Sequence, residues 1–241
     1  MKTTDYIKVT IDKFPKGYVF TYVDFITEVN SREAVIKALN RLASSNKIAK
    51  LSKGKFYKPE QSPFGDLEPS RKQVVKDLLE KDGKILGYIT GLAIYNQLHF
   101  TTQVSHVIQI GRNVTRPALK RGQYKIRFIK QNNIITKENI PLLQLIDVIR
   151  FINKIPDTNI ESSCKRLTAI LSELDAGKWK TMIRLSMKYP PATRALLGSI
   201  LERMNVIIDL KDLQKSLNPI TKYKLGISTQ VLSTSLNWNI I

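Results

Sequence analysis

The stretch that most constrains the fold is residues 30–59, with the sequence NSREAVIKALNRLASSNKIAKLSKGKFYKP. Its first half places apolar residues at helical spacing, and Ser31 precedes them where an N-cap belongs. Its second half contains two short apolar runs separated by Ser52-Lys53-Gly54, and Gly54 can adopt the positive φ of a tight turn. We therefore expect a helix followed at once by a lysine-rich, two-stranded hairpin.

The residues upstream supply further elements of the same small module. Residues 3–14 have the apolar spacing of a first helix, which the following Pro-Lys-Gly ends. Residues 18–20 predict a short strand that pairs with the hairpin, and Thr21 is placed to cap a brief second helix. This order of elements is typical of a winged helix-turn-helix. The sequence thus predicts a DNA-binding domain of this kind over residues 1–60.

In such a module the N-terminal part of the last helix enters the major groove, and the hairpin follows a neighbouring groove. Arg32 can fork to the edge of a guanine, while Lys37 and Arg41 can follow the phosphates. The expected DNA-binding residues are Ser31, Arg32, Glu33, Lys37, Asn40, Arg41, Lys50, Lys53 and Lys55. The alternative is that the helix and hairpin dock onto another protein, with their lysines merely solvated.

The charge of the chain favours a nucleic-acid partner. A formal net charge of +19 attracts polyanions such as nucleic acid or an anionic membrane surface. No apolar run approaches the roughly 20 residues of a membrane span, and no signal peptide is evident, so we expect no membrane partner. Cys164 is the one cysteine, which excludes an internal disulfide and fits a reducing cytoplasm. We expect a cytoplasmic protein.

The rest of the chain predicts a second, larger domain. Residues 61–70 hold proline and glycine at short intervals, which predicts a linker. Alternating apolar residues within 104–129 predict strands, apolar periodicity between 142 and 204 predicts helices, and residues 223–241 predict a returning strand. The expected fold class is α+β: an N-terminal winged helix-turn-helix, and over residues 71–241 a mixed sheet packed with several helices.

A second basic segment lies in this larger domain. Residues 111–131 contain lysine and arginine but neither aspartate nor glutamate. The expected basic face of the C-terminal domain consists of Arg112, Arg116, Lys120, Arg121, Lys125 and Arg127. Such a face would extend a phosphate-binding surface or contact an RNA. The alternative is a solvated strand edge whose charges prevent aggregation.

Catalytic motifs are scarce. His99 and His106 have no metal-ligand spacing to each other or to Cys164, and both favour structural roles. The chain contains neither a glycine-rich phosphate loop nor the paired acidic motif of a two-metal nuclease or nucleotidyltransferase. We therefore expect no enzymatic activity, no metal and no cofactor. An enzyme acting on nucleic acid is a third hypothesis, which the missing carboxylate cluster opposes.

Several features together resemble the AbiEi-type antitoxins of bacterial abortive-infection systems. They are the basic helix-and-hairpin module, the proline-bearing linker and the Tyr88-Ile89-Thr90-Gly91 stretch. The residues that continue this resemblance are Tyr95, Leu98, Thr101, Thr102 and Gln103. The segment 190–198, with the sequence PPATRALLG, is similar to part of an uncharacterised branch of that family.

The resemblance implies a transcriptional repressor that acts as the antitoxin of a type IV toxin–antitoxin system. Its implied partners are the double-stranded DNA of its own promoter, often at inverted repeats, and a nucleotidyltransferase-like toxin. In such systems the antitoxin opposes the toxin without a stable complex. The second hypothesis is a non-enzymatic interaction module whose C-terminal domain binds a toxin directly.

Overall fold

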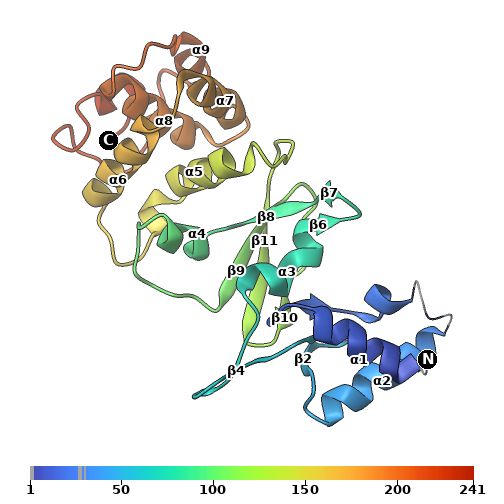
Figure 1. Ribbon diagram of the computed structural model, residues 1–241. Helices are drawn as coiled ribbons and strands as arrows, with labels where there is room; N and C mark the ends of the chain where they lie inside the picture. The colour runs from blue at the N-terminus through green and yellow to red at the C-terminus, as the bar shows by residue number, and fades with distance from the viewer. Residues whose placement is uncertain (1–2, 27–28, 30) are drawn as a thin grey trace. The chain divides into compact units, whose positions relative to one another are not determined.

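The computed structural model describes residues 3–26, 29 and 31–241, and the chain divides into two compact units. Unit 1 contains the residues up to Leu78 together with Leu119–Lys125. Unit 2 contains Leu79–Ala118 and Ile126–Ile241. Both units combine helices with strands (Figure 1), so the fold is mixed α+β, as expected.

In unit 1, α1 and α2 lie side by side over a small sheet (Figure 1). The elements of this unit, in chain order, are α1 (Thr3–Lys13), β1 (Val19–Phe20), the 3-10 helix η1 (Tyr22–Phe25), α2 (Arg32–Ser44), β2 (Ala49–Ser52), β3 (Lys55–Tyr57), β4 (Glu60–Ser62), β5 (Gly65–Leu67), α3 (Arg71–Leu79) and β10 (Leu119–Arg121).

Local sequence explains where the short helices of unit 1 begin. Ser31 caps α2, because its Oγ accepts a hydrogen bond from the Ala34 backbone N–H at 3.3 Å. Thr21 caps η1 in a capping box, in which the Asp24 carboxylate accepts from the Thr21 N–H at 2.8 Å. The expected second helix is therefore a 3-10 turn rather than an α-helix.

One apolar core holds these elements together. The fully or nearly fully buried residues that form it are Ile7, Ile11, Phe20, Phe25, Val35, Ala38, Leu39, Leu42, Ile48 and Phe56. Beneath the helices the strand order is β1-β3-β2, with Val19 opposite Tyr57 and Phe20 opposite Phe56. Gly54, at a φ of 72°, sits in the turn that joins β2 to β3. The order of helices, strand and hairpin is the expected one.

The segment expected to be an irregular linker, residues 61–70, differs from that expectation. Strands β4 and β5 form an antiparallel hairpin there, with Glu60 opposite Leu67 and Ser62 opposite Gly65. Pro63 falls in the turn between the strands rather than inside one, so it costs no ladder hydrogen bond. The side chain of Phe64 at the tip of this hairpin is fully exposed.

Helix α3, which lies within the expected C-terminal domain of residues 71–241, belongs almost entirely to unit 1. The Gln73 side-chain oxygen accepts a hydrogen bond from the Val19 N–H at 3.2 Å. The Lys76 ammonium lies 3.7 Å from the centre of the Tyr18 ring. These contacts are made by polar residues, which the apolar periodicity of α3 did not reveal.

Unit 2 combines a sheet, in the strand order β11-β9-β8, with a cluster of helices. Strand β11 begins at Tyr124, and its first two residues count with unit 1. The elements, in chain order, are β6 (Glu80–Lys81), β7 (Lys84–Ile85), β8 (Gly87–Thr90), α4 (Leu92–Gln97), β9 (Val107–Arg112), β11 (Tyr124–Lys130), α5 (Ile140–Arg150), η2 (Ile152–Lys154), α6 (Ile160–Ser172), α7 (Ala176–Ser186), α8 (Pro191–Arg203), α9 (Lys211–Lys215) and η3 (Ser235–Trp238).

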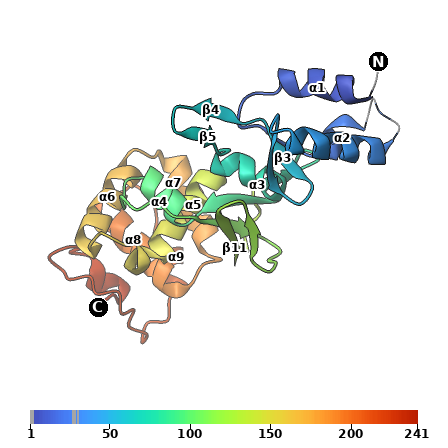
Figure 2. The same ribbon diagram turned by 90° about the horizontal axis from the view of Figure 1, so that it is seen from below.

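Helix α8 occupies the middle of the helical cluster (Figure 2) and contacts α5, α6, α7 and α9. Its middle, residues 195–201, is buried on all sides, and this stretch accordingly contains only apolar or small residues. Gly198 lies against the buried ring of Trp238, so closely that a side-chain carbon at this position would collide with the ring. The glycine in this segment therefore serves helix packing.

The expectation of a returning strand over residues 223–241 is wrong. The segment forms a single parallel bridge, between Tyr223 and Ile240, and the 3-10 helix η3. Its apolar residues Ile227, Leu232 and Trp238 pack on the helices instead of on the sheet. High β-propensity here reflects burial rather than strand pairing.

Within the described parts of the chain, every helix is either too short or too polar to cross a lipid bilayer.

Candidate functional site

The expected DNA-reading residues of α2 lie on the side of the helix that faces away from the core of unit 1. Arg32, Glu33, Lys37, Asn40 and Arg41 are all exposed. Their positions follow from helical geometry, because the buried residues of α2 occupy the opposite arc. The helix thus presents three cations, a carboxylate and an amide on one open side.

Two of the expected residues at the start of this helix already have intramolecular roles. The Ser31 hydroxyl accepts the capping hydrogen bond of α2. The Arg32 guanidinium lies 4.6 Å from the centre of the Tyr22 ring. Such stacking restricts the position of the arginine side chain but leaves its N–H groups available for hydrogen bonds.

The lysines of the hairpin fall into two groups. Lys50 and Lys53 are exposed. Lys55 is largely buried, and its ammonium forms an ion pair with Asp77 of α3 at 3.0 Å. Lys55 is therefore committed to holding β3 against α3, which differs from its expected role at the phosphates.

Arg121 departs furthest from the expected basic face. It is 7% exposed, and its guanidinium forms a two-pronged ion pair with Asp77, at 2.5 Å and 2.9 Å. It also donates to the Val74 carbonyl at 2.8 Å. Burial raises the pKa of the Asp77 carboxyl, but the hydrogen bonds from Arg121 and Lys55 outweigh burial, and the net pKa is lowered.

The remaining members of the expected basic face do not all belong to one unit. Lys120 and Lys125 are exposed residues of unit 1. Arg112, Arg116 and Arg127 belong to unit 2. The expectation that these cations form one face of the C-terminal domain is therefore corrected, because the β10–β11 turn carries part of the basic segment back into unit 1.

The cations in unit 2 also differ from one another. The Arg112 Nε donates to the Leu86 carbonyl at 3.3 Å. The Arg116 guanidinium lies 5.8 Å from the centre of the Phe128 ring, and Arg127 is exposed. Arg112 is thus partly used in holding the chain that leads into β8, while Arg116 and Arg127 are both exposed.

Sequence reasoning missed the most unusual chemistry of unit 2, a buried carboxylate surrounded by hydroxyl groups. Asp147 of α5 is fully buried. One carboxylate oxygen accepts from the Tyr88 and Thr90 hydroxyls, each at 2.8 Å, and the other accepts from the Tyr189 hydroxyl at 3.0 Å. The available signal was a lone acid within the apolar run Leu142–Ile149.

Gln131 fixes the direction of these hydrogen bonds. Its side-chain NH₂ donates to the hydroxyls of Tyr88 and Tyr189, both at 2.8 Å. Its carbonyl oxygen accepts from the Asn133 side chain at 3.0 Å, and Asn133 donates to the Leu185 carbonyl as well. Each phenol therefore accepts from Gln131 and donates to Asp147.

The electrostatics of this network follow from burial. Burial raises the pKa of the Asp147 carboxyl, and the three donated hydrogen bonds oppose that rise without cancelling it. Burial beside Asp147 likewise raises the pKa of the phenols of Tyr88, Tyr95 and Tyr189. The phenols thus stay protonated donors, and the network is suited to holding structure rather than to exchanging protons.

A glycine makes room for the network. Gly111 of β9 lies under the Tyr88 ring, where a side-chain carbon would come within 2.6 Å of the ring atoms. Tyr88 and Gly111 are direct partners in the β8–β9 register. The pairing of a tyrosine with a glycine therefore lets the phenol lie flat across the sheet.

The residues considered for metal binding or nucleophilic chemistry show no site. His99 and His106 are both exposed. Cys164 is buried in α6, and burial raises the pKa of its thiol to about 11. Across residues 3–26, 29 and 31–241, no three His, Cys, Asp or Glu side chains gather as metal ligands would.

Comparison with known proteins places the chain in a family. No curated protein matches it. Residues 6–179 match a family of unknown function, DUF6088. The match covers the helix-and-hairpin region, the β8–β9 pair and Asp147, but ends before Tyr189. Because it spans more than half of the sequence, the chain belongs to the DUF6088 family.

Proposed function

We propose that the protein is a transcriptional regulator whose unit 1 binds double-stranded DNA as a winged helix-turn-helix. In this proposal α2 enters the major groove, and the β2–β3 hairpin contacts phosphates beside it. One observation carries the proposal: an N-capped helix with an exposed polar side is followed directly by a hairpin that carries exposed lysines.

The described contacts divide the roles among the side chains. Arg32 sits in the first turn of α2 and is stacked on Tyr22, so it is the proposed reader of a guanine edge. Lys50 and Lys53 carry exposed ammonium groups and are the proposed phosphate contacts. Lys55 is excluded from this role, because its charge is paired with Asp77.

The experiment compares Arg32→Ala with Lys53→Ala on DNA from upstream of the gene and on unrelated DNA. Fluorescence anisotropy at several salt concentrations gives affinity and salt slope. Arg32→Ala should cost about 1–3 kcal/mol on the specific site only, because it removes a base contact. Lys53→Ala should weaken both DNAs alike and reduce the salt slope by about 1.

Lys180→Ala serves as the matched control, since Lys180 is an exposed lysine on α7 of unit 2. It changes the net charge equally and should leave the salt slope unchanged. If Lys53→Ala altered sequence preference while Arg32→Ala did not, the assigned roles would be reversed. If the unaltered protein bound no duplex at low salt, the proposal would be wrong.

Repression within a toxin–antitoxin pair stays a prediction from the resemblance to AbiEi-type antitoxins. Co-expression with the nucleotidyltransferase-like product of a neighbouring gene tests it. Restored growth without co-purification at high salt supports an antitoxin that forms no stable complex. Restored growth with co-purification supports the alternative, in which the C-terminal domain binds the toxin directly.

A further inference from the structure

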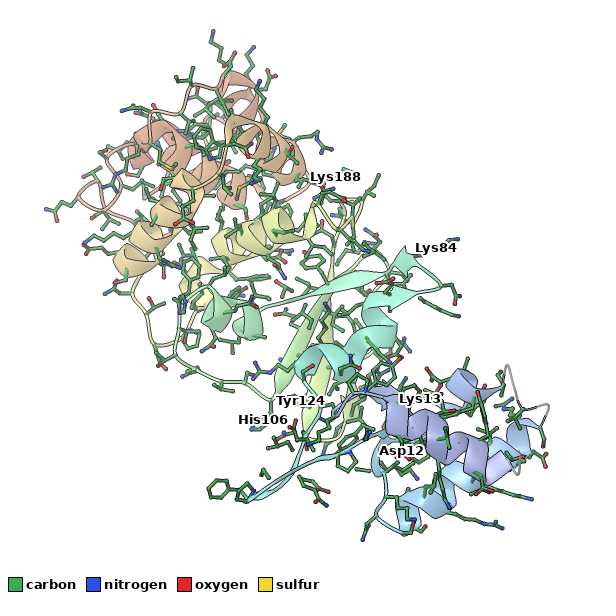
Figure 3. The ribbon with its side chains drawn as sticks, in the orientation of Figure 1. Asp12, Lys13, Lys84, His106, Tyr124 and Lys188 are labelled. Carbon is green, nitrogen blue, oxygen red and sulfur yellow. The ribbon has the colours of Figure 1, made fainter. Side chains whose placement is uncertain are left out.

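A cleft in unit 2 lies beside the buried network and is lined by basic side chains. Its volume is about 450 Å³. The wall comes from the end of β11 and the residues after it (130–132), from Arg150 at the end of α5, and from residues 188–190 between α7 and α8. Lys188 of this wall is labelled in Figure 3. Its ammonium group donates a hydrogen bond to the Asn132 carbonyl at 3.3 Å.

The charge of the wall is positive. Lys130, Arg150 and Lys188 line the cleft, and no acidic side chain does. None of the three forms an ion pair with a carboxylate of the described residues. Like charges gathered around a concave surface repel one another, and a bound anion relieves that repulsion.

Asp147, which accepts a hydrogen bond from Tyr189 of the cleft, is buried and already engaged. The hydroxyls of Tyr88, Thr90 and Tyr189 occupy its oxygens. Its burial keeps it out of the cleft, although its charge, when present, attracts Arg150. Lys188 donates one of its three N–H groups to the Asn132 carbonyl, and the other two remain available for a ligand.

The floor of the cleft is fixed in place. Gln131 and Tyr189 line it, yet they are only 3% and 6% exposed. Both are held by the hydrogen bond between them and by the bond from Tyr189 to Asp147. A floor that cannot rearrange loses little entropy when a ligand binds, which favours affinity.

The start of α8 adds a further attraction for anions. Pro190 lines the cleft and is the N-cap of this thirteen-residue helix. Pro190 and Pro191 carry no N–H and the Thr193 N–H donates to the Pro190 carbonyl, so the helix contributes the partial positive charge of its N-terminus rather than a row of open donors. This charge acts together with the three cations at the same cleft.

We propose that this cleft binds the phosphate monoester group of a nucleotide-sized ligand. Two of the cations balance a phosphate dianion, and an arginine fork matches its oxygens. The volume exceeds what a bare phosphate needs and falls within the range of small-molecule sites, about 300–1,000 Å³. A free nucleotide and the 5′-phosphorylated end of a nucleic-acid strand share this chemistry.

Isothermal titration of the full chain with adenosine 5′-monophosphate, adenosine and inorganic phosphate tests the proposal. We expect the monophosphate to bind more tightly than inorganic phosphate, and adenosine to bind at least about tenfold more weakly, since a hydrogen bond to a charged group contributes that much. Equal binding of adenosine and its monophosphate would overturn the proposal. The proposal would also be overturned if neither the monophosphate nor inorganic phosphate bound at millimolar concentration.

Variants locate the site. Arg150→Ala and Lys188→Ala should each weaken binding of the monophosphate by about tenfold. Lys180→Ala, on α7 but outside the cleft, should not change it. All three side chains are exposed, so the folded state should survive, and the fluorescence of Trp238 checks this. A loss in Lys180→Ala as large as that in Lys188→Ala would overturn the assignment.

A short single strand with a 5′-phosphate, compared with the same strand carrying a 5′-hydroxyl, separates the two sources of phosphate. A preference for the 5′-phosphate that Lys188→Ala abolishes identifies a strand end as the ligand. No preference, with binding of the monophosphate retained, identifies a free nucleotide. The Arg32→Ala variant should behave like the unaltered protein toward the monophosphate, so this site and the DNA-binding proposal can fail independently.

Discussion

Each unit holds an aspartate where its elements pack together, with a side chain 41% exposed for Asp77 of unit 1 and fully buried for Asp147 of unit 2, and the two units compensate its charge in opposite ways. In unit 1, Asp77 is paired with the cations Arg121 and Lys55. In unit 2, Asp147 is surrounded by hydroxyl groups and has no cation bonded to it among the described residues. Unit 1 therefore removes cations from its surface to build its interior, whereas unit 2 leaves its cations around a cleft.

The difference teaches how little the count of charges says about a binding surface. The segment 111–131 is among the most basic of the chain, yet its most buried cation serves a structural ion pair. The cleft of unit 2 draws its three cations from separate segments instead. Exposure and pairing decide which charges a ligand can reach.

The largest expected effect comes from breaking the network of unit 2. Asp147→Ala leaves three buried hydroxyls without their acceptor, and should reduce the free energy of unfolding of this unit by about 3–5 kcal/mol. Urea denaturation followed by tryptophan fluorescence measures it, because both tryptophans, Trp179 and Trp238, belong to unit 2.

Asp212→Ala is the control for that measurement, because it removes an exposed aspartate of α9 in the same unit. It should change the free energy of unfolding by less than about 0.5 kcal/mol. Comparable losses in the two variants would show that the network around Asp147 contributes no more to the free energy of unfolding of unit 2 than an exposed aspartate does.

A smaller loss is expected when the ion pair of unit 1 is broken. Arg121→Ala removes two hydrogen bonds to Asp77 and one to the Val74 carbonyl, and should destabilise unit 1 by about 2–3 kcal/mol. Amide hydrogen exchange of α1 and α2 reports this loss. Lys120→Ala, the exposed neighbour in the chain, should have almost no effect. A reversed order of the two variants would contradict the structural role of Arg121.

The last comparison is the response to pH, in which the two units should differ in sign. The pKa of Asp77 is lowered on folding, so its pair stabilises unit 1 above the unfolded pKa, about 3.9, and this contribution is lost as pH falls through the folded pKa. The pKa of Asp147 is raised, so the folded state of unit 2 takes up the proton first. Unit 2 should gain stability as pH falls toward about 3.9.

Measuring both units between about pH 3 and 8 sharpens the comparison. Hydrogen exchange follows unit 1 and tryptophan fluorescence follows unit 2. Asp77→Asn should flatten the acid limb of unit 1 only, and Asp147→Asn should flatten the profile of unit 2 only. If the stability of both units fell together on acidification from neutral pH, the raised pKa of Asp147 would be contradicted.

Much of unit 1 could be predicted from sequence, because its signals are local. The cap at Ser31, the apolar spacing of α2 and the turn at Gly54 each depend on a few neighbouring residues. The hairpin β4–β5 escapes sequence reasoning because proline and glycine at short intervals predict a linker, whereas Pro63 occupies a turn between two strands. The membership of α3 depends on long-range polar contacts, which periodicity does not carry.

The sites of unit 2 could not be predicted in the same way. Tyr88, Gln131, Asp147 and Tyr189 are far apart in the chain, and the fold alone brings them together. The cleft likewise combines residues from β11, α5 and the α7–α8 turn. The one local hint was an acid inside an apolar helix, since a buried carboxylate requires partners.

The sharing of Leu119–Lys125 with unit 1 has a consequence for any attempt to separate the two halves of this protein. A single cut after Leu78 would deprive Asp77 of Arg121 and would leave the Leu51 carbonyl without the Gly122 N–H that donates to it. The unit that carries α2 is thus not formed by the N-terminal residues alone. Shuffling it onto another protein would require a second excision, or a replacement for the seven-residue piece supplied from downstream.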